Sequence, residues 1–83
     1  MNFAVYIIYS AAVNKYYVGH TDNLKRRLHE HNTGQTRFTQ QGKPWILKYS
    51  ENFSSRIEAM KREREIKNMK SRKYIEQLVS SAA

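Results

Sequence analysis

The sequence contains no cysteine among its 83 residues, and it has only seven acidic side chains. The absence of cysteine excludes disulfide bonds, thiolate metal ligands and a cysteine nucleophile, so the fold must be stabilised by packing alone. It also favours an intracellular protein, and we expect a cytoplasmic location. A chain of this length is expected to form one domain over residues 1–83, with a compact core.

Long hydrophobic runs are missing as well. The longest apolar stretch covers about residues 3–9, far short of the roughly 20 residues that cross a bilayer. No basic segment precedes this stretch and no cleavage-type sequence follows it. We therefore expect neither a signal peptide nor a membrane partner.

The few acidic residues stand against an excess of basic ones. Fifteen Lys and Arg against seven Asp and Glu give a formal net charge of +8. Such a balance favours polyanionic partners, with nucleic acid first and an anionic membrane surface second. The alternative is a protein near the ribosome, or one whose basic charge serves solubility only. On charge alone, nucleic acid is the favoured partner.

Three segments have the pattern of strands. Residues 3–9 are apolar on both parities, which is typical of a central strand covered on both faces. Residues 15–19 predict a second strand, joined to the first in a hairpin by a loop of about five residues. Residues 45–53 predict a third strand with one packed face. Its large apolar residues of one parity are Trp45, Leu47, Tyr49 and Phe53.

Helices are expected between and after these strands. The first begins after a cap at Thr21 or Asp22 and ends near Asn32 and Gly34.

Two more helices follow the third strand. Ser55 and Glu58 have the spacing of a capping box, so a helix is expected from there to about Met69. Ser71 is placed to cap a last helix through Val79. The predicted fold class is α+β, a three-stranded antiparallel sheet flanked by helices, in the order β-β-α-β-α-α.

Glu63 falls on the apolar stripe of the helix expected after Ser55. The residues that define the stripe are Ala59, Met60 and Ile66. Glu58 and Glu65 point nearly the opposite way. A carboxylate that faces a core is costly unless it is paired, hydrogen-bonded or bound to a metal. From the residues alone, an ion pair with Lys67 or Arg27 is the simpler explanation, and a Mg²⁺-type cation is the other.

The first expected helix places a second charged residue beside its apolar side. Leu24 and Leu28 mark the buried side, and Arg27 flanks it while Arg26 points away. Arginine suits a phosphate because its planar fork binds two oxygens and its charge is permanent. His31 flanks the same side and is open to three interpretations: a hydrogen bond to a tyrosine hydroxyl, a contact to phosphate, or a helix C-terminal residue favoured by the dipole.

Four motifs in this order and spacing resemble those of a known family. Val5-Tyr6-Ile7 stands where a GIY triad would be, and Tyr17-Val18-Gly19 stands where a YIG triad would be. Asn23-Leu24-Lys25-Arg26-Arg27 matches an N-L-x-x-R helix, and Glu63 is followed by Ile66-Lys67. The chain resembles the GIY-YIG nucleases, in particular the small stand-alone bacterial members and the N-terminal nuclease domain of the bacterial excision nuclease.

The resemblance covers about residues 3–79 and departs from the family pattern in the first triad, where Val5 replaces glycine. What it implies is a metal-dependent endonuclease that hydrolyses nucleic-acid phosphodiester bonds, in DNA repair or recombination, leaving a 5′-phosphate and a 3′-hydroxyl. The implied cofactor is Mg²⁺ or Mn²⁺, bound by Glu63. The implied catalytic residues are Tyr6, Tyr17, Arg27 and His31.

The resemblance also implies roles for the two tyrosines. Tyr6 would accept a proton from the attacking water, and Tyr17 would position the phosphate or the nucleophile. A free tyrosine has a pKa of about 10. The role of Tyr6 therefore requires positive charge nearby, from Arg27 or the metal.

Further contacts to the nucleic acid, most simply DNA, are expected from residues near the second triad and from basic residues of the helices. They are Gly19, His20, Lys25, Arg26, Lys67 and Lys70. His20 stands where the excision nuclease has a lysine, and its alternative is a loop residue at the end of a strand. A partner protein or a homodimer is left open. The alternative to an enzyme is a non-catalytic, basic nucleic-acid-binding or protein-interaction module.

Overall fold

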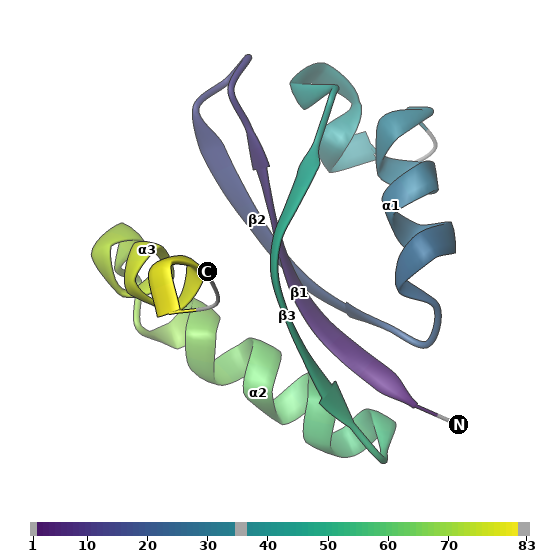
Figure 1. Cartoon of the computed structure of the whole chain (residues 1–83), viewed down its shortest axis with the longest axis vertical. Helices are drawn as coiled ribbons and strands as arrows, with labels where there is room; N and C mark the ends of the chain where they lie inside the picture. The colour runs from purple at the N-terminus through teal and green to yellow at the C-terminus, as the bar shows by residue number, and fades with distance from the viewer. Residues whose placement is uncertain (1, 35–36, 82–83) are drawn as a thin grey trace.

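The computed structural model describes residues 2–34 and 37–81, with the side chains of residues 37–39 left aside (Figure 1). The elements in chain order are β1 (Phe3–Ser10), β2 (Lys15–Thr21), α1 (Leu24–Asn32), the 3₁₀ helix η1 (Arg37–Gly42), β3 (Ile46–Phe53), α2 (Arg56–Asn68) and α3 (Arg72–Ser81). Apart from η1, this is the predicted order β-β-α-β-α-α, and the α+β fold class is confirmed. No helix in the described ranges is long and apolar enough to cross a bilayer.

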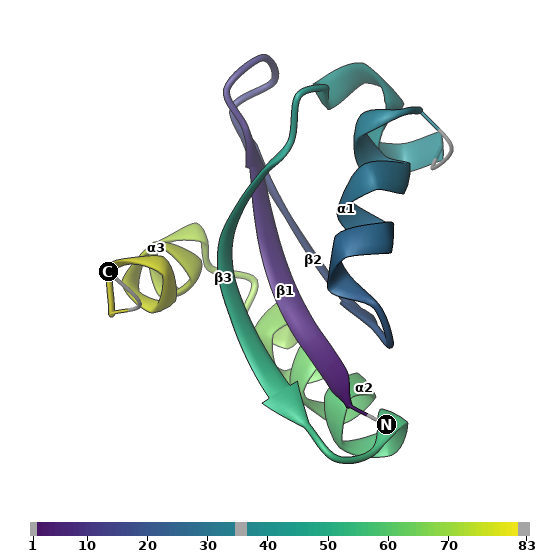
Figure 2. The ribbon, with the colours of Figure 1, turned by 45° about the vertical axis from the view of Figure 1, so that its right-hand side comes forward.

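The three strands form one antiparallel sheet in the order β2-β1-β3. The central position of β1 agrees with its apolar residues on both parities, because helices cover both faces of the sheet (Figures 1 and 2). Val5 and Ile7 pack into a core with residues of α2 and α3. Tyr6 and Ile8 pack on the opposite face, against Trp45 and residues of α1. Two apolar clusters therefore stabilise the domain, one on each face.

The third strand differs from its prediction in which residues share a face. The pairing of β3 with β1 is irregular between Ile7 and Ile8, which lie opposite Tyr49 and Leu47. Tyr49 packs into the cluster on the α2 side, whereas Trp45 is buried in the cluster on the α1 side and Leu47 is exposed. The expectation of one packed parity over residues 45–53 is wrong, because an irregularity of one residue exchanges the two faces of a strand.

The start of α1 also differs from its prediction. The N-cap is Asn23, whose side-chain oxygen accepts a hydrogen bond from the backbone of Arg26 at 3.0 Å. Thr21 is the last residue of β2, and its hydroxyl accepts a hydrogen bond from the backbone N–H of Asn23 at 3.1 Å. The caps predicted at Thr21 and Asp22 are wrong because β2 continues for two residues beyond Gly19 and moves the turn along the chain.

The start of α2 predicted at Ser55 and Glu58 is confirmed, with Ser55 as the N-cap. The backbone N–H of Glu58 donates to Ser55 Oγ at 3.2 Å, and this hydroxyl donates to Glu58 Oε1 at 3.0 Å. Ser71 Oγ accepts from the backbone N–H of Tyr74 at 3.1 Å, as expected for a residue that caps α3. These local contacts account for the helix boundaries that the sequence already indicated.

Candidate active site

Tyr6 and His31 form a buried pair on the α1 side of the sheet. Tyr6 lies on the central strand and is 2% exposed, and His31 lies in the last turn of α1 and is fully buried. The Tyr6 hydroxyl is 2.8 Å from His31 Nε2. A tyrosine hydroxyl is one of the partners that the sequence left open for His31.

Burial keeps both members of this pair uncharged at neutral pH. Burial raises the pKa of Tyr6 to about 12, and the neighbouring Arg27 guanidinium opposes this rise only in part. Burial lowers the pKa of His31 to about 4, and the charge of Arg27 acts in the same direction. The positive charge that a Tyr6 phenolate requires is therefore present, but burial outweighs it.

Gly19 provides the space in which the Tyr6 ring lies. The two residues are opposite each other in the pairing of β1 with β2. A Cβ atom at position 19 would lie 2.6 Å from the Tyr6 hydroxyl oxygen and 3.2 Å from a ring carbon of Tyr17. Only glycine leaves room for this close approach. The third residue of the second triad thus has a steric role beside any contact to nucleic acid.

Tyr17 of β2 lies next to the buried pair of Tyr6 and His31, on the α1 side of the sheet. Its ring centroid lies 6.4 Å from that of Tyr6 and 5.1 Å from that of His31, with the imidazole edge-on. The indole of Trp45 lies on a further side of Tyr17, with ring centroids 6.4 Å apart. Tyr17 is half-buried whereas Tyr6 is almost completely enclosed, so Tyr17 is the more exposed of the two tyrosines.

Arg27 reaches the same cluster from α1. Its side chain is one-third exposed and donates a hydrogen bond to Glu30 Oε1 at 3.0 Å. Arg26 turns away, is more than half exposed and pairs with Asp22 at 2.7 Å. The separation of the two arginines follows the expected helical geometry.

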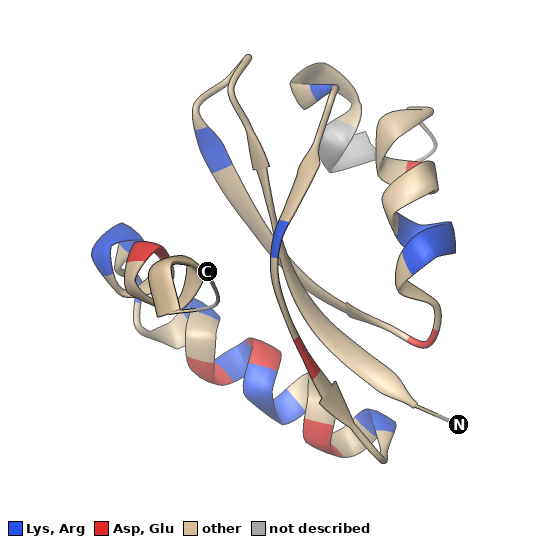
Figure 3. Cartoon of the chain, in the orientation of Figure 1, with Lys and Arg blue, Asp and Glu red and all other residues tan. Residues whose placement is uncertain are grey.

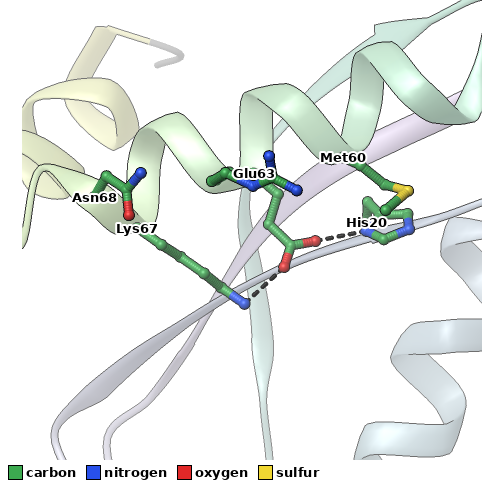
Figure 4. Close-up of a pocket in the computed structure, with 6 residues that line it drawn as sticks. His20, Met60, Glu63, Lys67 and Asn68 are labelled. Atoms are coloured by element: carbon green, nitrogen blue, oxygen red, sulfur yellow. Dashed lines mark hydrogen bonds and ion pairs between the residues drawn. The ribbon is translucent and has the colours of Figure 1, made fainter.

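The Glu63 side chain of α2 lies on the other face of the sheet, where it points toward β2. His20 Nδ1 of β2 is 2.6 Å from Glu63 Oε1, and Lys67 Nζ is 2.6 Å from Glu63 Oε2 (Figure 4). Burial raises the pKa of the Glu63 carboxyl, but the contacts with Lys67 and His20 more than offset this and hold the pKa below its usual value. The ion pair with Lys67 that the sequence left open is present, whereas Arg27 pairs with Glu30 on the opposite side of the sheet.

The apolar stripe of α2 is narrower than predicted. Ala59 and Ile66 are buried, as expected, but Met60 is 40% exposed. Placing Met60 in the buried stripe is wrong, because α2 packs on the sheet through Ala59 and Ile66 and leaves Met60 at the border. There it lines a pocket of about 250 Å³. The lining residues are His20, Met60, Glu63, Arg64, Lys67 and Asn68 (Figure 4).

His20 is the residue whose position the sequence described least well. It lies within β2 and not in a loop, and its side chain reaches α2. The signal that indicates this is parity: His20 is two residues from Val18, which is buried in the cluster on the α2 side. Side chains of alternate strand residues share a face, so His20 must point toward α2 as well.

The residues of the α1 side, around Tyr6 and Arg27, and those of the α2 side, around Glu63, meet at β2. This strand is an edge strand of the sheet. Lys67 Nζ, bound to Glu63, lies 5.9 Å from the centroid of the Tyr17 ring. Tyr17 in turn contacts the buried pair of Tyr6 and His31. One continuous set of contacts therefore joins the glutamate of α2 to the tyrosines and the arginine on the α1 side.

The family of this protein follows from a comparison of its whole sequence. The family model described as the GIY-YIG catalytic domain matches residues 2–75. The chain belongs to the GIY-YIG family. This family is part of the nuclease superfamily, and the match includes both triads, Arg27 and Glu63.

The relatives of this GIY-YIG chain are small proteins of similar length. It is 44% identical to a UPF0213 protein of Staphylococcus haemolyticus over 76% of this chain and 77% of the relative. It is 39% identical to a UPF0213 protein of Halobacterium salinarum over 78% of this chain and 84% of the relative. The fold is similar to the solution structure of the UPF0213 protein BH0048 from Bacillus halodurans, with a TM-score of 0.61. The two sequences are 37% identical, and the match covers 96% of this chain and 84% of that one.

Other basic residues of this GIY-YIG protein, besides Arg27, lie on both sides of the sheet (Figure 3). Lys25 and Arg26 are exposed on α1. Lys67 and Lys70 are exposed at the end of α2 and just after it. The lysines and the arginine expected to contact nucleic acid thus form two groups, and of these two groups the one with Lys67 adjoins Glu63.

Possible metal ligands in this GIY-YIG domain are few. Across residues 2–34 and 37–81, no group of three or more His, Cys, Asp or Glu side chains is arranged to hold a metal ion. The carboxylate of Glu63 and the imidazole of His20 are the two donors in contact at the pocket.

Proposed function

We propose that this GIY-YIG protein is a metal-dependent endonuclease that hydrolyses phosphodiester bonds of nucleic acid, most simply DNA during repair or recombination. The observation that carries the proposal is the gathering of an arginine, two tyrosines and a glutamate around one edge strand, although they come from four different elements. A plain structural role would not require these residue types at one edge.

The exposed basic side chains would bind the scissile phosphate. Arg27 is one-third exposed, and its guanidinium contacts Glu30 and the Tyr6 hydroxyl. Its remaining N–H groups can bind phosphate oxygens. Lys67 is half exposed and stands over Tyr17. We propose that Arg27 binds the phosphate that is cut and that Tyr17 positions it.

The Tyr6–His31 pair supplies a route for the proton of the attacking water. A free Tyr6 phenolate is disfavoured because burial raises its pKa to about 12. His31 is neutral, and with its proton on Nδ1 it can accept at Nε2 the hydroxyl proton of Tyr6. Tyr6 then takes a proton from water as its own proton passes to His31, and the nearby Glu30 carboxylate stabilises the imidazolium that forms.

The hydrolysis forms one bond to phosphorus and breaks another. The water oxygen bonds to phosphorus, and the bond from phosphorus to the 3′ oxygen breaks. The 3′ oxygen takes a proton from solvent, so the products are a 5′-phosphate and a 3′-hydroxyl. The imidazolium of His31 then loses one proton to solvent, which restores the neutral pair of Tyr6 and His31.

Glu63 is the residue that would hold the divalent cation, Mg²⁺ or Mn²⁺. Its carboxylate faces a pocket of about 250 Å³, and one carboxylate with waters and phosphate oxygens suits such a cation. When bound, the cation supplies positive charge to the leaving oxygen. Contacts with Lys67 and His20 hold the Glu63 carboxylate in place at the pocket.

Cleavage of labelled branched, single-stranded and duplex DNA with Mg²⁺ or Mn²⁺ tests the proposal. Glu63→Gln keeps the size of the side chain and removes its charge, and we expect it to lower the cleavage rate by about a hundredfold or more. Glu65→Gln, on an exposed position of the same helix, is the matched control and should cut like the wild type. Equal cleavage by Glu63→Gln and the wild type would contradict the assigned site.

A second function, binding of nucleic acid without cleavage, is favoured by one observation. Glu63 is already paired with Lys67 and His20, and Tyr6 and His31 already contact each other. Such a network is stable without metal or substrate. Binding of DNA by wild type and Glu63→Gln alike, with no cleavage under any metal condition, would favour this function.

A further inference from the structure

The contact between His20 and Glu63 adds a nitrogen to the pocket where the cation would bind. His20 Nδ1 lies 2.6 Å from Glu63 Oε1, and both side chains are about one-fifth exposed. The pocket that they line extends past Met60 to Arg64 and Lys67. The hydrogen bond places a nitrogen and an oxygen side by side at the wall of the pocket, where both could bind one ion in place of the shared proton.

We propose that His20 is a second protein ligand of the divalent cation, binding through Nδ1, and that it makes this site prefer Mn²⁺ to Mg²⁺. The inference rests on the proposed function in one respect only, that Glu63 binds a cation.

The spacing of the two side chains suits this role. Neighbouring ligands of an octahedral ion with bonds of about 2.0–2.1 Å are about 2.9 Å apart. The observed 2.6 Å needs to widen by a few tenths of an ångström, which small side-chain rotations provide. Neither backbone has to move, because His20 is held opposite Val5 in the strand ladder and Glu63 lies within α2.

The other contacts of Glu63 leave its carboxylate able to exchange partners. Lys67 holds the second oxygen, and its side chain is half exposed, so it can turn toward solvent or a phosphate. With Lys67 already neutralising Glu63, a second cationic partner is not needed for charge balance. In the contact with Glu63 the Nδ1–H of His20 donates to the carboxylate. A cation bound at Nδ1 would replace this proton, which passes to solvent while Nε2 carries the ring N–H. The imidazole then offers a lone pair at Nδ1, which ammonium and guanidinium lack.

The identity of the donor atoms decides which ion is preferred. Mg²⁺ selects oxygen ligands and gives up its waters reluctantly. Imidazole nitrogen suits transition metals, and Mn²⁺ is the transition metal of the two ions, although it also takes oxygen ligands. A site with carboxylate alone would discriminate weakly between the two ions, so the imidazole is the source of the preference.

Binding of the metal alone, without nucleic acid, tests the role of His20. Mn²⁺ binding is followed by the loss of the free-ion EPR signal, and Mg²⁺ binding by its competition with Mn²⁺. We expect His20→Asn to weaken Mn²⁺ binding by about tenfold or more and to weaken Mg²⁺ binding by less than about threefold. His29→Asn, at an exposed position of α1, should change neither.

A direct measurement on the wild type keeps the test independent of how the variants fold. Pulsed EPR of the Mn²⁺-loaded protein should detect a coupled ¹⁴N nucleus, which His20→Asn removes and His29→Asn retains. Lys67→Met should also retain the ¹⁴N coupling and should bind Mn²⁺ more tightly, because the ammonium that competes for Glu63 is absent.

Two results would overturn the inference, and they differ in what they mean for the enzyme. If Glu63→Gln abolishes Mn²⁺ binding while His20→Asn leaves it unchanged and no ¹⁴N coupling is seen, His20 is no ligand but the cation site at Glu63 stands. If neither variant alters Mn²⁺ binding, both the ligand role of His20 and the assignment of Glu63 are wrong.

Discussion

The two sides of strand β2 differ in how they hold their functional residues. On the α1 side, Tyr6 and His31 are buried, neutral and bonded to each other. On the α2 side, Glu63 is charged and partly exposed, and it shares its two oxygens between His20 and Lys67. Buried neutral groups have fixed positions, whereas partly exposed ion pairs can exchange partners at little cost. The α1 side thus sets geometry, and the α2 side offers charge that a ligand can recruit.

Arg27 is the exception to this division, because it is a charged residue on the α1 side, and its removal should have the largest effect. We expect Arg27→Ala to lower the rate of DNA cleavage about 10²–10³-fold, since it removes the cation assigned to the phosphate. Single-turnover cleavage with saturating Mn²⁺ measures the change. Arg26→Ala, an exposed neighbour paired with Asp22, should lower the rate much less. An equal loss in the two variants would mean that the arginines act only through general charge.

Gly19→Ala tests whether the α1 side is as closely packed as the geometry indicates. A methyl group there would meet the Tyr6 hydroxyl at 2.6 Å, and we expect a loss of about 3 kcal/mol in the free energy of unfolding. Urea denaturation measures this loss. The same substitution in a Tyr6→Leu background should cost less, because the ring that it meets is gone. Equal costs in both backgrounds would place the strain elsewhere.

The neutral state of His31 predicts a smaller effect that depends on pH. Its pKa is about 4 in the folded protein against 6.5 for a free histidine. Below pH 6.5 the unfolded chain therefore binds a proton that the folded protein does not, so stability falls as the pH drops. Between pH 7 and pH 5 this amounts to about 2 kcal/mol, a window that lies above the usual carboxyl pKa of about 4.

Urea denaturation at the two pH values measures this contribution, and the comparison of variants assigns it. His31→Gln should remove most of the difference between pH 7 and pH 5. His29→Gln, which changes an exposed histidine of the same helix, should retain it. A pH dependence that survives in His31→Gln would show that other groups cause it.

Features that depend on neighbours in the sequence could be predicted well. The cap of α2 at Ser55 and the central position of residues 3–9 follow from local hydrogen bonding and periodicity. The same periodicity separated Arg26 from Arg27 and turned Glu63 toward the sheet while Glu65 faces solvent. These expectations need only the repeat of a helix or strand, which the residues themselves carry.

Features that depend on contacts between distant segments could not be predicted. The irregular pairing of β3 moved Trp45 to the α1 side, and no pattern within residues 45–53 indicates such a shift. The extension of β2 to Thr21 moved the cap to Asn23. In each case the pairing with another strand decided the outcome, because backbone hydrogen bonds across a sheet override weak local preferences.

By itself, the sequence determined the order of elements, the family motifs and the helix faces that carry Arg27 and Glu63, since each depends on local spacing. Only the tertiary structure decided that Tyr6 lies over Gly19 against His31, and that His20 reaches Glu63. It also decided the charge state of the centre, because burial shifts the pKa of Tyr6 and of His31 away from their ordinary values. Burial is a property of the whole packed domain, and no short stretch of sequence contains it.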